Sequence, residues 1–194
     1  MKLTNLFENT IDHRKIKKLL DEMHVGNYTI NEDGIVDVDG DVNIIYTAWT
    51  SIPVQFGRVS GDFNCCLNNL TTLRGCPTEV GGDFNCSRNY LTTLIGGPTE
   101  VGGHFYCNLN KLTSLQGCPR EVQGYFNCSW NELTDLQHAP REVGFIFDCS
   151  YNKLTSLRGS IREVGEDFRC WNNLWQGIQP DHSFINIGGH FGWK

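Results

Sequence analysis

The chain has 194 residues and a net charge of −6, with 16 lysines and arginines interspersed among 22 aspartates and glutamates. This composition argues against a nucleic acid or an anionic membrane as a partner bound over a broad surface, because neutralising phosphates requires a basic face. No apolar run approaches the roughly 18 residues of a membrane span, and the N-terminal segment lacks the apolar stretch of a signal peptide, so we expect a cytoplasmic protein.

The first predicted element is a helix over residues 10–23. Apolar residues recur there at helical spacing, from Ile11 through Leu20 to Met23, and Thr10 precedes them as the expected N-cap. Residues 28–38 then predict a hairpin of two short strands around a turn at 31–34. We interpret residues 1–37 as an N-terminal cap that covers the first coil of the region that follows.

From residue 38 to residue 194 the chain repeats with a period of 21 residues. The repeating columns are valine (Val59 to Val164), phenylalanine (Phe63 to Phe168), cysteine (Cys65 to Cys170), asparagine (Asn68 to Asn152) and two leucines (Leu70 to Leu154 and Leu73 to Leu157). The unit can be written V-x-G-x-F-x-C-x-x-N-x-L-T-x-L-x-G-x-P-x-E. A fixed period of this length predicts a solenoid, in which each coil buries its apolar side only against its neighbours.

Within each unit, Phe and Cys alternate with polar residues, which predicts one short strand with both side chains pointing inward. The segments at 38–44 and 187–193 match this strand too, the latter two residues out of phase, so we expect about eight strands. Leu174 lies one residue early for its column. We therefore expect the last coil, over residues 171–194, to be irregular.

The segment "GGDFNCSRNYL", residues 81–91, resembles the leucine-rich repeat, whose signature is L-x-x-L-x-L-x-x-N-x-L. Phe84 and Cys86 match its strand positions, Asn89 and Leu91 follow them, and the first leucine is displaced to Val80. The resemblance implies a horseshoe with a parallel concave sheet, extended or 3₁₀ convex segments, and a hydrogen-bonded ladder of asparagines. The sequence of the repeat unit is most similar to those of repeat proteins from tailed bacteriophages and bacteria.

Once the inward columns are assigned, the residues between them must face outward. Early coils present Asp, Asn and Ser there, whereas the middle and late coils present large side chains. Adjacent strands lie about 4.8 Å apart, so these side chains form one patch across roughly four coils. The candidate binding residues are His104, Tyr106, Leu109, Tyr125, Trp130, Ile146, Asp148, Tyr151, Arg169 and Trp171. Such patches concentrate binding energy, although aromatic stacking across strands is a purely structural alternative.

The repeated cysteines are best explained as small core residues. Parallel stacking places them poorly for disulfides, and of the cysteines outside the column Cys66 is expected to face outward as the most reactive thiol. The acidic segment at 37–41 does not match a calcium-binding loop, so we predict no metal and no cofactor. No catalytic motif is found either, and we predict that the chain is not an enzyme.

The sequence therefore predicts a protein-binding module that acts through its concave face. Its resemblance to phage proteins implies a host protein as the partner, and inhibition of a host defence or regulatory factor as the effect. One alternative is a small-ligand or nucleotide binder, or a minimal enzyme, that uses His104, Tyr106, Asp148 and Arg169. Another is a structural protein that associates with itself through its final strand, 189–193.

Overall fold

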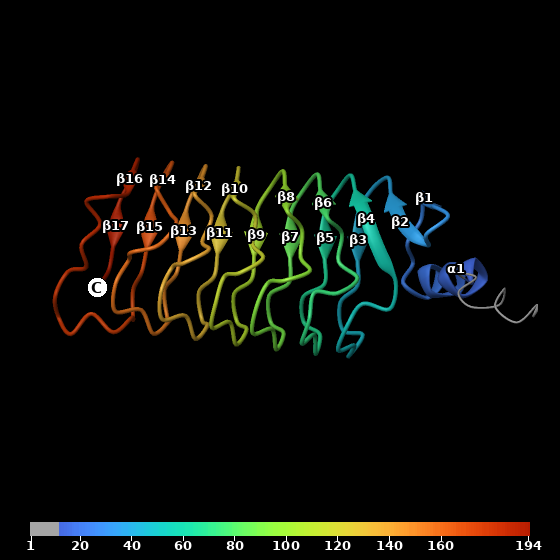
Figure 1. Cartoon of the computed structure of the whole chain (residues 1–194), viewed down its shortest axis with the longest axis horizontal. Coiled ribbons are helices and arrows are strands. Elements are labelled where there is room, and N and C mark those ends of the chain that lie inside the picture. Colours follow the sequence, from blue (N-terminus) through green and yellow to red (C-terminus); the bar gives the residue numbers. More distant parts are fainter. Residues whose placement is uncertain (1–11) are drawn as a thin grey trace, which may run out of the picture.

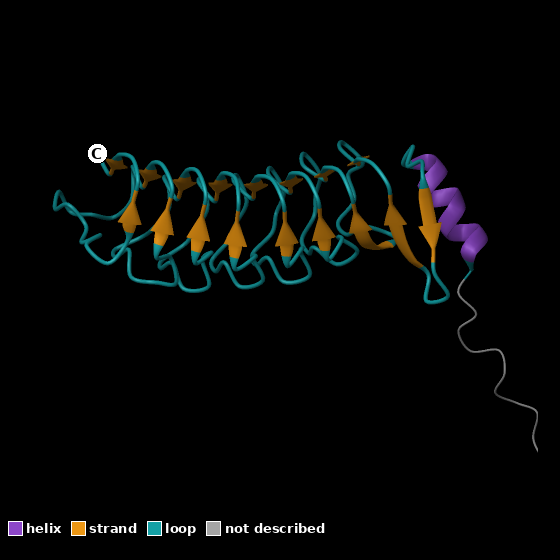
Figure 2. Ribbon diagram, turned by 90° about the horizontal axis from the view of Figure 1, so that it is seen from above, coloured by secondary structure: helices purple, strands orange, loops and turns teal. Residues whose placement is uncertain are grey.

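Residues 12–194 are described by the structure, a computed structural model. They form a row of stacked coils between the helix α1 (His13–Glu22) and the strand β17 (Phe191–Gly192) (Figure 1). Each regular coil contributes two short strands, which lie on different sides of the stack (Figure 2). The predicted β-rich solenoid is therefore confirmed. The row is nearly straight in both views, without the pronounced bend that the horseshoe expectation implied.

The N-terminal end of the stack carries the helix α1 (His13–Glu22) and a hairpin of β1 (Tyr28–Ile30) and β2 (Ile35–Val38). The helix begins later than residue 10, because the carboxylate of Asp12 caps it by accepting from the N–H groups of Arg14 and Lys15 at 3.1 and 3.4 Å. Asp12 is thus the N-cap in place of Thr10, which lies outside the described residues. Strand β2 also pairs with the next coil, so the hairpin continues directly into the solenoid.

The Phe–Cys segments form one unbroken parallel sheet, here called the long sheet. Its eight strands are β3 (Val42–Asn43), β5 (Phe63–Asn64), β7 (Phe84–Asn85), β9 (Phe105–Tyr106), β11 (Phe126–Asn127), β13 (Phe147–Asp148), β15 (Phe168–Arg169) and β17 (Phe191–Gly192). From β5 to β17 each phenylalanine pairs with the phenylalanine of the next coil. The predicted number of strands and their register are confirmed.

A second row of strands, which the sequence analysis missed, runs through the Glu–Val positions. It comprises β4 (Gln55–Val59), β6 (Glu79–Val80), β8 (Glu100–Val101), β10 (Glu121–Val122), β12 (Glu142–Val143), β14 (Glu163–Val164) and β16 (Asn186–Ile187). These strands join the hairpin in a five-stranded sheet that ends at β8, and a four-stranded sheet begins at β10. The return segments are therefore partly extended, as expected, and otherwise consist of bends and turns.

The break between β8 and β10 lies next to Gln123. Glycine occupies the equivalent position in the neighbouring coils, and a Cβ atom on Gly102 or Gly144 would overlap the carbonyl oxygen of the preceding coil. These glycines donate to Val80 and Val122 respectively, both at 2.9 Å. Gln123 has a Cβ atom, and in the described chain its N–H makes no such bond to the preceding coil. The missing bond at Gln123 therefore coincides with the break between the two sheets.

The core is a set of parallel columns along the axis. The phenylalanines from Phe63 to Phe168 are fully buried, and consecutive rings in this column, continued by Phe191, lie 5.0 to 5.9 Å apart. Beside them, the repeated valines, leucines and cysteines are also buried. This arrangement confirms the predicted inward columns.

The asparagine column forms the ladder that the resemblance implied. The side-chain amide of Asn131 donates to the carbonyls of Cys107 and Cys128 at 3.1 and 3.0 Å, and its oxygen accepts from the N–H of Leu112 at 2.9 Å. Each asparagine thereby satisfies buried backbone groups of two coils, which turns cannot do for themselves. The same pattern continues to Asn173, one coil beyond the predicted column.

The last coil departs from the repeat later than predicted. Trp175, not Leu174, takes the buried leucine position, and its indole N–H donates to the carbonyl of Cys170 at 2.9 Å, while Leu174 is exposed. The chain then gains two residues, because β14 pairs Glu163 with Asn186, a separation of 23 residues instead of 21. The predicted phase shift is confirmed, but the expectation that Leu174 fills its column early is wrong.

Candidate functional site

The first outward column of the long sheet forms a second ladder of hydrogen bonds. The carboxylate of Asp62 accepts from the backbone N–H of Asp83, and that of Asp83 accepts from His104, both at 2.7 Å. The Nδ1 atom of His104 then accepts from the N–H of Tyr125 at 2.8 Å. These side chains therefore hold consecutive coils together, which also explains the acidic strip at the N-terminal end without a metal.

This side-chain ladder stops at Tyr125 and Ile146. Ile146 has no acceptor atom and the Tyr125 hydroxyl bonds elsewhere, so within the described chain no side chain accepts from the N–H of Ile146 or Asp167. The ladder resumes where the carboxylate of Asp167 accepts from the N–H of His190 at 3.0 Å. Two coils have thus lost a hydrogen bond that the other coils keep.

Each acceptor is matched by a glycine in the following coil. A Cβ atom on Gly82, Gly103 or Gly124 would overlap the accepting atom of Asp62, Asp83 or His104. Gly61 and Gly189 stand in the same relation to Asp41 and Asp167. Behind Tyr125 and Ile146, by contrast, the chain has Phe145 and Glu166. The glycine therefore makes room for the acceptor as well as for the backbone of the preceding coil, and where the acceptor is missing a large side chain takes the position.

An aromatic cluster occupies the place where the ladder fails. It consists of His104, Tyr106, Tyr125 and Phe145. The rings of His104 and Tyr106, and those of Tyr106 and Tyr125, meet edge to face with centroids 5.8 Å apart. Phe145 lies edge to face with His104 at 6.4 Å and is 49% exposed. Sequence reasoning missed Phe145, although its replacement of the second glycine of the GG pair is a signal that was available.

Asp148 contacts this cluster through Tyr125. Its carboxylate accepts from the hydroxyl of Tyr125 at 3.1 Å and from the N–H of Ser150 at 2.9 Å, and the residue is only 9% exposed. Burial, and then the Asp148 carboxylate, raise the pKa of the Tyr125 phenol well above its usual range. Burial also raises the pKa of Tyr106. Both phenols therefore remain neutral hydrogen-bonding groups at physiological pH.

The corner that follows each cysteine presents another column of outward residues. Leu109, Trp130 and Tyr151 all have φ of 56°, in the left-handed region that usually selects Gly, Asn or Asp. The rings of Trp130 and Tyr151 stack with centroids 4.0 Å apart and planes 9° apart, and the residues are 51% and 40% exposed. The earlier coils place Leu67 and Arg88 at this corner with φ of 56° and 55°, so the stacked aromatic pair, not the backbone conformation, distinguishes the late coils.

The structure thus divides the predicted site residues into three groups. His104, Tyr106 and Tyr125 join the aromatic cluster, with Ile146 and Asp148 on the adjacent coil. Leu109, Trp130 and Tyr151 form the corner column. Arg169 and Trp171 lie further along, where the guanidinium group is 5.7 Å from the indole centroid and bonds to Asp167 at 3.1 Å.

All nine cysteines are free thiols. Cys66 lies outside the hydrophobic core cluster, but the expectation that it is a reactive thiol is not supported, because it is only 8% exposed and burial raises the pKa of its thiol. Cys118 is partly exposed, but burial raises the pKa of its thiol to about 12, and it donates to the carbonyl of His138 at 2.8 Å. Neither is a reactive thiolate near neutral pH.

Residues 12–194 bring no three His, Cys, Asp or Glu side chains together in a way that would hold a metal ion. That part of the chain also has no helix with the length and apolar character needed to cross a bilayer. No family model, curated protein or solved structure matches the chain.

Proposed function

We propose that the chain is a non-enzymatic protein-binding module whose contact surface is the late half of the long sheet. The observation that carries this proposal is the interruption of the side-chain ladder at Tyr125 and Ile146. At these two coils the repeat gives up a hydrogen bond between a side chain and the backbone of the next coil, and gains exposed aromatic side chains. Local rules that maximise stability are typically broken at functional sites.

The chemistry of the surface supports a protein partner. Trp130, Tyr151 and Phe145 are each 40% exposed or more, and Trp and Tyr dominate the residues that carry binding energy in protein interfaces. Their rings are held in place by contacts with each other or with His104, so binding them costs little side-chain entropy. The Tyr125–Asp148 pair adds a polar group beside these apolar anchors.

The same geometry disfavours a small enzyme or nucleotide site on this sheet. His104 uses its Nδ1 atom to hold the next coil, and Asp148 is engaged with Tyr125 and Ser150. A general acid or base needs a free atom within reach of a substrate. Both carboxylate oxygens of Asp148 are thus engaged in the fold, and of His104 only the Nε2 atom remains available to a substrate.

The resemblance of the repeat to bacteriophage and bacterial proteins sets the context of the proposal. We infer that the partner is a bacterial protein in the cytoplasm, and that binding inhibits a defence or regulatory factor. A rigid, preformed surface suits this role, because it loses little conformational freedom on docking.

Affinity capture from bacterial lysate, read by mass spectrometry, tests the proposal. The triple variant Tyr106→Ala, Tyr125→Ala, Trp130→Ala should lose a partner that the unmodified chain retains. The matched control is Tyr46→Ala, which removes an aromatic that is 73% exposed but lies outside the late coils. Loss of the same partner in the control, or its retention by the triple variant, would contradict the proposal. A captured candidate must then bind the purified unmodified chain and the Tyr46→Ala control, and must bind the triple variant more weakly.

A further inference from the structure

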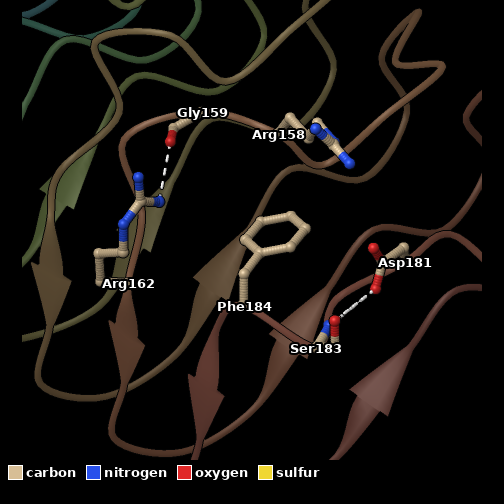
Figure 3. A pocket seen from close by; sticks show the side chains of 6 residues that line it. All are labelled: Arg158, Gly159, Arg162, Asp181, Ser183 and Phe184. Atoms are coloured by element: carbon tan, nitrogen blue, oxygen red, sulfur yellow. Dashed lines mark hydrogen bonds between the residues drawn. The ribbon is translucent and has the colours of Figure 1, made fainter.

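The last coil contains a cavity that is larger than the cavity of about 350 Å³ around Arg141 in the preceding coil. It has a volume of about 520 Å³ and lies between the turn at 158–162 and the lengthened segment that precedes β16 (Figure 3). Its lining residues are Arg158, Gly159, Arg162, Asp181, Ser183 and Phe184. The last three belong to the coil that is two residues longer than the others.

Arg162 is held in position by the backbone. Its Nη1 atom donates to the carbonyl oxygens of Gly159 and Ile161 at 2.9 and 2.7 Å. Among the described residues its Nε and Nη2 atoms have no partner, which leaves one edge of the guanidinium available. A guanidinium that is already oriented loses little freedom when it binds an oxyanion in a bidentate way.

The other lining residues add charge and an apolar surface. Figure 3 shows the ring of Phe184 between the two arginines, with Asp181 and Ser183 beyond it. The carboxylate of Asp181 accepts from both the N–H and the hydroxyl of Ser183, at 3.1 and 2.8 Å. These bonds, and more weakly Arg158, lower the pKa of Asp181. Asp181 therefore stays ionised and offsets part of the charge of Arg158, whereas Arg162 has no acidic partner within the described chain.

We propose that this cavity binds a small molecule that carries an oxyanion beside a flat apolar group. The oxyanion is held by the free edge of Arg162, with Arg158 as a second positive charge, and the flat group lies against Phe184. Asp181 disfavours molecules with a second anionic group at its end of the cavity. This site is separate from the long sheet and does not depend on the proposed protein partner.

Isothermal titration calorimetry of the full chain tests the site with four probes: phenyl phosphate, benzoate, inorganic phosphate and benzyl alcohol. We expect saturable binding of one molecule of phenyl phosphate or benzoate, and at least tenfold weaker binding of benzyl alcohol. Phosphate esters and carboxylates share the required oxyanion, and the stronger of the two probes identifies the natural source. Failure of both oxyanion probes to bind, or equal binding of benzyl alcohol, would overturn the proposal.

Two pairs of variants assign the binding to its residues. Arg162→Gln should weaken the better probe at least tenfold, and the control Arg120→Gln, in the same column two coils earlier, should not. Arg158→Gln should weaken it severalfold, and Arg74→Gln, its equivalent in an early coil, should not. If Arg162→Gln is less well folded by circular dichroism, Arg158→Gln decides. Equal losses in a variant and its control would contradict the assignment.

Phe184→Leu separates the two halves of the site. It should weaken phenyl phosphate at least threefold and leave inorganic phosphate unchanged, because only the ester has a flat group to place on the ring. Equal weakening of both probes would show that Phe184 supports the fold and not the ligand.

Discussion

The early and late coils of the long sheet differ in the turn that precedes each phenylalanine. In the early coils a carboxylate bonds to the next coil, and a glycine behind it makes room for the accepting oxygen, as in the pair Asp83 and Gly103. In the late coils an apolar or aromatic residue replaces the acceptor, and a side chain replaces the glycine, as in the pair Tyr125 and Phe145. The backbone pairing of the long sheet is the same in both.

This difference shows that the two positions are coupled. Glycine here does not serve a left-handed backbone, since among Gly61, Gly82, Gly103 and Gly124 no positive φ is found. It serves the neighbour's hydrogen bond. Once the acceptor is lost, the glycine is no longer needed, and both positions become available for side chains that point to solvent. The solenoid can therefore gain large outward side chains at the cost of one hydrogen bond per coil, about 1 kcal/mol.

The largest effect is expected where early and late coils do not differ. Asn89→Ala and Asn131→Ala each remove a buried amide that satisfies several backbone groups, and each should lower the free energy of unfolding by about 3 kcal/mol. Urea unfolding followed by circular dichroism measures both. A loss in one coil that is several times the loss in the other would contradict the view that the asparagine ladder is uniform.

A smaller effect should separate the two kinds of coil. Gly103→Ala places a Cβ atom on the accepting oxygen of Asp83, so it should break that hydrogen bond and cost about 2 kcal/mol. Phe145→Ala changes the equivalent position of a late coil, where no acceptor needs room, and should cost less than half as much. The two urea midpoints give the comparison, and equal losses would refute it.

The smallest effect concerns acid at the point where the ladder resumes. The N–H of His190, and then Arg169, lower the pKa of Asp167. A carboxyl with a lowered pKa in the folded state stabilises that state above its ordinary pKa, and this contribution is lost as the pH falls through the lowered value. We expect the amide signal of His190 to shift in that acidic range in NMR spectra, and the shift to disappear in Asp167→Asn. A shift centred at or above the ordinary aspartate value would contradict this.

The period of the sequence was enough to predict the solenoid, its long sheet and its inward columns, because each coil repeats the same apolar residues. The Glu–Val strands were missed because two residues are too few for a recognisable alternation. Phe145 was missed because outward positions were assigned only from the residue before each phenylalanine onward, and Phe145 lies one residue earlier. The coupling of glycine to acceptor needs the coils to be placed side by side. The cavity at Arg162 depends on an irregular coil, which periodicity does not describe.

The double-mutant cycle of Ile146→Asn and Glu166→Gly tests the coupling most directly. Asparagine supplies the missing acceptor for the N–H of Asp167 without adding a carboxylate, and glycine makes room for it. We predict that the double variant is more stable than the sum of the single variants by about 1 kcal/mol in urea unfolding. Additive effects, or a double variant less stable than that sum, would contradict the account.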